Sequence, residues 1–217
     1  MGRQAKSKQA RKVNDMAVIE RFCYFAAPIL KEYFRPDSCL NATRVIIGVL
    51  DYFGVACREM SVLALVFNEV WWKRMEEKNA FPESAEESDT WVADGGWSLY
   101  CGPDNEETST GWPGHLVVLA AGHLIDPFAR QFCRNDHKIL APDILVVPVS
   151  RDFATGAKHV HFKPPEAPAG FNSVIAYRAL PHDKRYEEMP GWTNQRENPA
   201  VALEIVSAME ERSSDDE

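Results

Sequence analysis

The sequence predicts a domain in which helices pack against an antiparallel sheet, and three stretches carry this prediction. Residues 37–54 place apolar side chains at helical spacing, and residues 55–67 alternate as a strand does. Residues 115–126 form two short apolar runs around an Ala-Gly pair, as a β-hairpin does. With 217 residues, 45% of them hydrophobic, the chain can bury one sizeable core. We therefore expect a single domain over residues 15–210.

Both ends of the chain are polar and are expected to lie outside this domain. Residues 1–14 are locally basic and predict a flexible arm, with contact to phosphates as the alternative. Residues 211–217 predict an acidic, disordered tail. The net charge of −8 argues against a protein built to coat nucleic acid. Apart from the arm, nucleic acid is not an expected partner.

The cysteines and the apolar runs bear on the cellular compartment. The five cysteines are an odd number and show no CxxC spacing, which fits a reducing cytoplasm better than a disulfide framework. The first residues do not resemble an export signal, and no apolar run reaches membrane-spanning length. We expect a cytoplasmic protein without a membrane partner.

Two helices are predicted before the first strand. Residues 16–34 space apolar side chains by threes and fours until Pro36. The second helix has start residues at Asp37 and Ser38 and a terminating glycine at Gly54. Cys39 is therefore expected in the first turn of a mostly buried helix.

The remaining elements are predicted on both sides of the hairpin. Residues 69–110 are rich in Glu, Asp, Gly, Pro and Ser and, after a short helix suggested near Trp71, predict a long acidic insertion on the surface. Strands are expected at 144–147 and 173–177, with a weaker candidate at 158–162. Asn198 followed by a proline begins a final helix.

The hairpin brings a histidine and a carboxylate together if its turn has two residues. With Ala121-Gly122 as the turn, Val117 faces Asp126 across the two strands. Alternation then places His115 and Asp126 on one face of the sheet as diagonal neighbours. A three-residue turn would move Asp126 to the other face.

Cys39, His115 and Asp126 together form a candidate nucleophile, base and orienting group. A helix N-terminus and a nearby imidazolium both stabilise a thiolate. A histidine positioned by a carboxylate can take the thiol proton and return it to a leaving group. The Cys39 backbone N–H also lacks an intrahelical acceptor and could donate to an oxyanion.

The order of these residues resembles a known family. The segments are Ser38-Cys39-Leu40-Asn41-Ala42-Thr43-Arg44, Gly111-Trp112-Pro113-Gly114-His115-Leu116-Val117 and Leu124-Ile125-Asp126-Pro127. Over roughly residues 16–180, this order of elements is similar to the transglutaminase-like branch of the papain-fold cysteine enzymes. The resemblance implies an α+β, papain-like core with the cysteine helix packed on an antiparallel sheet. It also implies acyl transfer through a thioester: hydrolysis of peptide, isopeptide or other amide bonds, or transfer to an amine, without a cofactor.

The sequence departs from papain at the oxyanion hole. Papain places a glutamine a few residues before its cysteine, and residues 33–38 contain none. Tyr33 and Gln131 are the candidates for this role, although Tyr33 falls on the apolar stripe of its helix and fits the core better. Trp112, between glycines, is either a packing anchor or a lid that faces the substrate. The substrate and the oligomeric state are not readable from the sequence.

Two other classes of protein remain open. A papain-fold binding protein without activity would use Cys39 as a small buried hydrophobe, His115 as a strand histidine and Asp126 as a turn residue. A zinc protein would use nitrogen, oxygen and sulfur ligands close in sequence or on one strand face. Its candidate ligands are His123, Asp126, Cys133, His137, His159 and His161.

Overall fold

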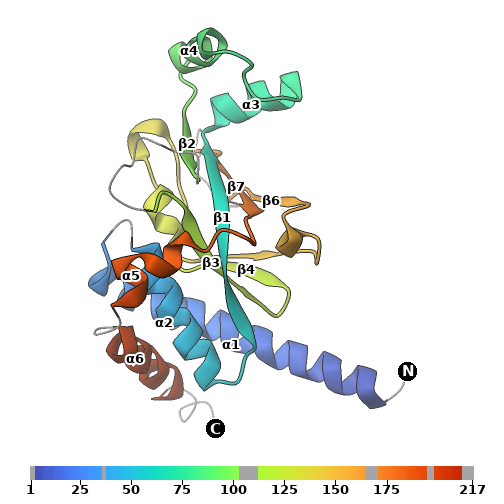
Figure 1. The fold of residues 1–217 in the computed structure, drawn as a ribbon, viewed down its shortest axis with the longest axis vertical. Coiled ribbons are helices and arrows are strands. Elements are labelled where there is room, and N and C mark those ends of the chain that lie inside the picture. The colour runs from blue at the N-terminus through green and yellow to red at the C-terminus, as the bar shows by residue number, and fades with distance from the viewer. Residues whose placement is uncertain (1–2, 36–37, 103–111, 165–170, 195–197, 212–217) are drawn as a thin grey trace.

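One antiparallel sheet organises the fold (Figure 1). The computed structural model describes residues 3–35, 38–102, 112–164, 171–194 and 198–211, with side chains from residue 14 onward. Within these ranges the strands follow the order β5-β4-β3-β1-β7-β6, β2 pairs with β1, and the sheet curls until it is nearly closed. The strands are β1 (Cys57–Phe67), β2 (Ser98–Cys101), β3 (His115–Ala120), β4 (His123–Asp126), β5 (Leu145–Pro148), β6 (His159–Phe162) and β7 (Val174–Ala179).

The expected mixture of helices and antiparallel strands is confirmed, whereas a papain-like core remains a proposal. Four short 3₁₀ helices accompany the α-helices in the described part of the chain. The α-helices are α1 (Arg3–Tyr33), α2 (Cys39–Tyr52), α3 (Glu69–Lys78), α4 (Ala85–Ala93), α5 (Pro190–Thr193) and α6 (Asn198–Glu211). The 3₁₀ helices are η1 (Ala129–Phe132), η2 (Asn135–His137), η3 (Phe153–Thr155) and η4 (Arg185–Glu188).

The central strand β1 sets the register of its neighbours. Its first half pairs with β3, from Cys57 opposite Ala120 to Val62 opposite His115. Its second half pairs with β7 and β2. The eleven residues of β1 therefore pair with three strands, β2, β3 and β7. Apolar residues on both faces of β1 explain this position, because a strand covered on both sides can exclude water from every ladder hydrogen bond.

Two buried clusters occupy the two sides of the sheet. The first joins α1, α2 and α6, where the apolar stripe of α2 (Val45, Ile46, Val49) is fully buried with Val118 and Ile125 of the hairpin. Each such side chain contributes about 1.5–3 kcal/mol when it is buried. The second cluster fills the inner side of the curled sheet and contains Val62, Ala64, Val66, Val117, Phe132 and Tyr177. Cys39 belongs to a separate, smaller cluster with Leu116 and Tyr186.

The two-residue turn of the hairpin is confirmed. Ala120 pairs with His123, and the register continues to Val118 opposite Ile125. Ala121 and Gly122 have φ values of 49° and 81°, which correspond to a turn with positive φ at both central positions. The next pair in this register is Val117 with Asp126, so Asp126 lies on the same face as His115.

Much of the segment that was expected to form a flexible arm has helical backbone. Helix α1 begins at Arg3 and so includes most of residues 1–14. These residues are mainly Ala, Lys, Arg and Gln, which favour helices, and they contain no proline. Extending an existing helix is also easier than starting one. In the expected acidic tail, Glu211 ends α6, and residues 212–217 lie outside the described part of the chain.

The expected long surface insertion also contains regular structure. Residues 69–110 include α3, α4 and β2, while residues 103–110 lie outside the described ranges. Asn68 and Ser84 cap the two helices by accepting hydrogen bonds from Trp71 N and Glu87 N. Trp71 and Trp91 are buried against each other, with ring centroids 5.2 Å apart. These aromatic anchors outweigh the polar composition that suggested a loop.

None of the described helices has an apolar stretch long enough to cross a membrane. The strands expected at 144–147, 158–162 and 173–177 correspond to β5, β6 and β7, and the final helix begins at Asn198 as expected.

The turn gives a prediction about stability. Ala121 has a side chain that disfavours positive φ, whereas asparagine tolerates this region and precedes glycine in the preferred turn of this type. We expect Ala121→Asn to stabilise the protein by about 0.5–1 kcal/mol. Its midpoint of thermal unfolding should then rise by about 2 °C. Gly122→Ala is the matched control and should lower the midpoint; a rise in that variant would contradict the turn geometry.

Candidate active site

Cys39 is the first residue of α2, and its side chain is 7% exposed. It packs with Leu116 and Tyr186, beside the partly buried Leu40, Trp112 and Trp192. Ser38 precedes the helix without forming a side-chain cap to the first-turn N–H groups. The Thr43 hydroxyl donates to the Leu116 carbonyl over 3.1 Å, which fixes α2 against β3 one residue beyond His115.

The predicted histidine–aspartate pair forms in the structure. His115 Nε2 lies 2.7 Å from Asp126 Oδ2, and the side chains are 2% and 0% exposed. The two residues start β3 and end β4, so the short hairpin determines their separation. A buried carboxylate at this distance fixes both the orientation of the imidazole and the nitrogen that carries its proton.

Asp126 has two further hydrogen-bond donors, which the sequence did not reveal. The Phe128 backbone N–H donates to Oδ1 over 3.0 Å, and the Tyr177 hydroxyl donates to Oδ2 over 2.8 Å. Together with His115 they give both oxygens of this fully buried carboxylate hydrogen-bond partners. Tyr177 belonged to an expected strand, but no pattern in the sequence indicated its cross-strand partner, so this contact had no signal there.

His115 is held in its charged form. Burial by itself would lower the pKa of the imidazole, but the negative charge of Asp126 and its hydrogen bond raise it, and Cys39 adds a hydrogen bond and a charge interaction. The net result is a pKa well above the usual 6.5. The Cys39 thiol is therefore a neighbour of the His115 imidazole.

Gln131 contacts the other nitrogen of the same ring. Its side-chain amide lies 3.0 Å from His115 Nδ1. The amide can donate its N–H to a neutral imidazole, or present its oxygen to the N–H of an imidazolium after a half-turn. Gln131 thus touches the base itself. Its predicted role as an oxyanion donor stays a prediction.

Trp112 is anchored on both sides. Its indole N–H donates to Asp183 Oδ2 over 3.2 Å, and its ring lies 5.6 Å from that of Tyr186. A Cβ added to Gly114 would approach the indole to 2.3 Å, so the ring rests directly on the glycine backbone. Of the two predicted roles for Trp112, these contacts favour the packing anchor.

Tyr33 lies on the surface rather than in the core where the sequence placed it. It is 50% exposed, and its hydroxyl donates to Glu204 on α6 over 2.9 Å. That hydrogen bond, together with the Glu204 charge, raises the pKa of Tyr33. The ring borders an open hollow of about 580 Å³ that Ser38, Asn41 and Gly191 also line. Because Ser38 adjoins Cys39, this hollow lies beside the start of α2.

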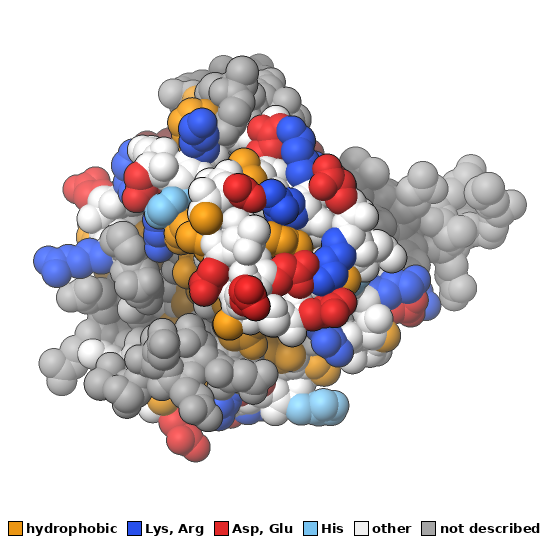
Figure 2. Space-filling model, turned by 90° about the horizontal axis from the view of Figure 1, so that it is seen from above, with side chains coloured by type: hydrophobic (Ala, Val, Ile, Leu, Met, Phe, Trp, Pro, Cys, Tyr) orange, Lys and Arg blue, Asp and Glu red, His pale blue; other side chains and the backbone are white. Residues whose placement is uncertain are grey.

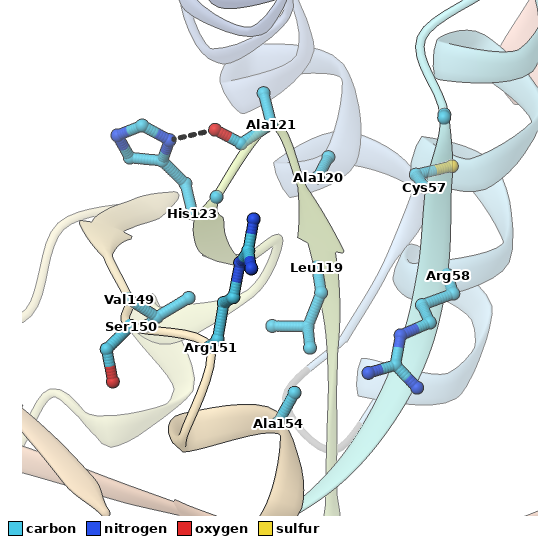
Figure 3. A pocket seen from close by; sticks show the side chains of 12 residues that line it. Cys57, Arg58, Leu119, Ala120, Ala121, His123, Val149, Ser150, Arg151 and Ala154 are labelled. Carbon is cyan, nitrogen blue, oxygen red and sulfur yellow. Dashed lines mark hydrogen bonds between the residues drawn. The ribbon is translucent and has the colours of Figure 1, made fainter.

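The candidate zinc ligands are dispersed among other partners. His123 Nδ1 lies 3.2 Å from the Ala121 carbonyl, at an open groove between β1, the hairpin and η3 (Figure 3). Cys133 donates to the Ala141 carbonyl, His137 stacks on Trp97, and His161 stands 5.7 Å from Trp72. Within the described ranges, no three His, Cys, Asp or Glu side chains are grouped to hold a metal ion.

Comparisons with known proteins identify no family for this chain. Neither family models, nor curated proteins, nor solved structures give a match. The site must therefore be interpreted from its own geometry.

The charge of His115 gives a prediction about pH. In Asp126→Asn the burial remains and the main stabilising charge is lost, so we expect the His115 pKa to fall below 6.5. Long-range ¹H–¹⁵N spectra of ¹⁵N-histidine protein measure this shift, with His115→Gln to assign the signal. An unchanged titration in Asp126→Asn would contradict the pairing.

The same pair predicts how stability depends on pH. A histidine whose pKa is raised by folding contributes fully below pH 6.5, and its contribution is lost as the pH rises through the native value. Urea unfolding at pH 6 should show Asp126→Asn about 3 kcal/mol less stable than the wild type. The difference should shrink at a pH above the native pKa; a difference that grows with pH would oppose this assignment.

Proposed function

We propose that the protein is a cysteine-dependent hydrolase or acyltransferase that acts on amide bonds. The observation that carries this proposal is the chain of contacts from Cys39 to His115 and from His115 to Asp126 at 2.7 Å. A nucleophile, a base and an orienting carboxylate in this arrangement support acyl transfer. Their order along the chain supports a place in the transglutaminase-like branch of the papain fold.

The first half of the reaction forms a thioester. The Cys39 thiolate attacks the carbonyl carbon of the amide. The carbonyl oxygen takes up the negative charge and becomes an oxyanion. The first-turn N–H groups of α2, to which Ser38 forms no side-chain cap, can donate to that oxyanion. The C–N bond then breaks, and the leaving amine takes a proton from the His115 imidazolium.

The second half releases the acyl group. Neutral His115 removes a proton from water or from an acceptor amine, which attacks the thioester carbon. The C–S bond breaks, the thiolate leaves, and the imidazolium forms again beside Asp126. Water gives a carboxylic acid and an amine gives a new amide, so one site serves both outcomes. The acyl donor is proposed to be a protein, peptide or other amide.

The contacts around the pair suit these proton transfers. Hydrogen bonds from Tyr177 and Phe128 hold the Asp126 carboxylate in place beside His115 in both halves of the reaction. Gln131 can serve His115 in either protonation state by turning its amide. These residues position the base and are not proposed to touch the substrate.

A binding protein without activity is the second candidate. It is favoured by the 7% exposure of Cys39 and by the aromatic rings around it, because a buried thiol also serves as a small core residue. The two candidates differ in the reactivity of the thiol, which is directly measurable.

Thiol labelling distinguishes the two candidates. We expect iodoacetamide at pH 6.5 to modify Cys39 first among the five cysteines, because Cys39 lies beside the His115 imidazolium. Burial raises the pKa of Cys23 to about 11 and that of Cys57, which also faces Asp51, to about 12, so both should react slowly. Peptide mapping by mass spectrometry gives the rate at each cysteine.

Two variants control this experiment. His115→Gln keeps a hydrogen-bonding side chain but cannot carry the charge, and it should slow labelling of Cys39 by at least about tenfold. Cys39→Ser should remove the fast phase and leave the other cysteines unchanged. Circular dichroism and thermal unfolding establish that each variant is folded. Equal labelling rates at all cysteines in the folded wild type would contradict the proposed activity and favour the binding protein.

A further inference from the structure

A second cavity, of about 280 Å³, lies between α3 and the strands β1, β6 and β7. Alternating residues of β1 form its floor, namely Leu63, Leu65 and Phe67, and α3 adds Trp72 and Met75. It opens near the α3–α4 end of the molecule, where hydrophobic side chains are exposed among charged ones (Figure 2). Its size is at the lower end of the range for small-molecule sites.

Aromatic side chains form one wall of this cavity. The Phe67 ring lies 6.0 Å from that of Trp72 and 6.1 Å from that of Phe81. Phe81 is 51% exposed, although a ring of this size gains free energy when it is covered. An apolar guest in the cavity would cover Phe81 and the partly buried side chains beside it.

The opposite wall is basic. His159 pairs with Arg178, and His161 pairs with Ala176, so strand alternation brings both histidines and Arg178 to one face. All three side chains line the cavity, and no residue of the lining is acidic. Arg178 donates through Nε to the Gly156 carbonyl over 3.4 Å, which leaves the outer nitrogens of its guanidinium for a ligand.

The charge partners of Arg178 differ from those of the neighbouring Lys163. Some lysines and arginines of the described chain pair with carboxylates, as Lys73 does with Glu69. Lys163, which lies over the Trp72 ring at 5.0 Å, is paired in this way with Glu76. No salt bridge of this kind joins Arg178 to a carboxylate of the described chain. A negative group on a ligand would supply the missing partner.

We propose that this cavity binds a small carboxylate with an aromatic or branched aliphatic body. The apolar body lies against Leu65, Phe67 and Trp72, and the carboxylate accepts hydrogen bonds from Arg178 and His161. A guanidinium pairs with a carboxylate through two parallel N–H groups, which fixes the orientation of the ligand. The site is distinct from the proposed acyl transfer at Cys39, so either proposal can fail without the other.

Titration with 3-phenylpropionate tests the site, with 3-phenylpropionamide as its neutral match. We expect saturable binding of the carboxylate with a Kd below about 1 mM and at least tenfold weaker binding of the amide. In ¹H–¹⁵N spectra the indole signal of Trp72 should shift on binding. The full-length wild-type protein is used throughout.

Three variants locate the ligand. Arg178→Gln, at an exposed position, should weaken the carboxylate at least tenfold and leave the amide unchanged. Ala176→Leu, which fills the cavity from β7, should abolish both. Arg151→Gln, an arginine of the separate groove in Figure 3, should change neither. Absence of binding in the millimolar range, equal binding of acid and amide, or normal binding to folded Ala176→Leu would each overturn the proposal.

Discussion

The buried contact between His115 and Asp126 imposes more conditions on the structure than any other described contact. An imidazolium and a carboxylate without water cost free energy unless their separation and their other hydrogen bonds are nearly ideal. The 2.7 Å separation meets the first condition, and the donors Phe128 N and Tyr177 OH meet the second. These groups come from β3, β4, the segment after β4, and β7, so the pair depends on a correctly folded sheet.

The central strand β1 connects these dependencies. Val62 faces His115 on one side and Ala179 on the other, so a single residue relates the histidine strand to the tyrosine strand. A shift of β3 by one residue would turn His115 out of the inner side of the sheet and place Leu116 there. The hydrogen bond from Thr43 to the Leu116 carbonyl opposes such a shift and also fixes α2. The position of Cys39 therefore follows from the same register.

Local patterns in the sequence explain which parts of this arrangement were predictable. The hairpin, the helix start before Cys39 and the Ala121-Gly122 turn depend on neighbouring residues, and the sequence predicted all three. Tyr177 reaches Asp126 from a distant strand, and such pairing leaves no local pattern. The short helix near Trp71 was expected, whereas α4 was missed because the buried Trp91, rather than composition, stabilises it. The start of α1 was missed because a basic segment can be either a helix or a solvated arm.

Burial has opposite consequences for the chemistry and for access to it. It strengthens the attraction between His115 and Asp126, because little water remains to screen the charges. It also surrounds Cys39 with Leu40, Trp112 and Trp192. Trp112 is fixed by Asp183, and the Trp192 ring lies under the Arg44 guanidinium at 4.5 Å.

The hollow beside Ser38 and Asn41 is therefore the approach that disturbs these contacts least. In the proposed reaction, a substrate that enters from this hollow would meet the first turn of α2. Its carbonyl oxygen could point at the N–H groups of that turn while its carbon faces the Cys39 sulfur, since both belong to the same helical turn. The leaving nitrogen would then lie toward His115. The geometry that limits access to the thiol would in this way also determine the orientation of the amide.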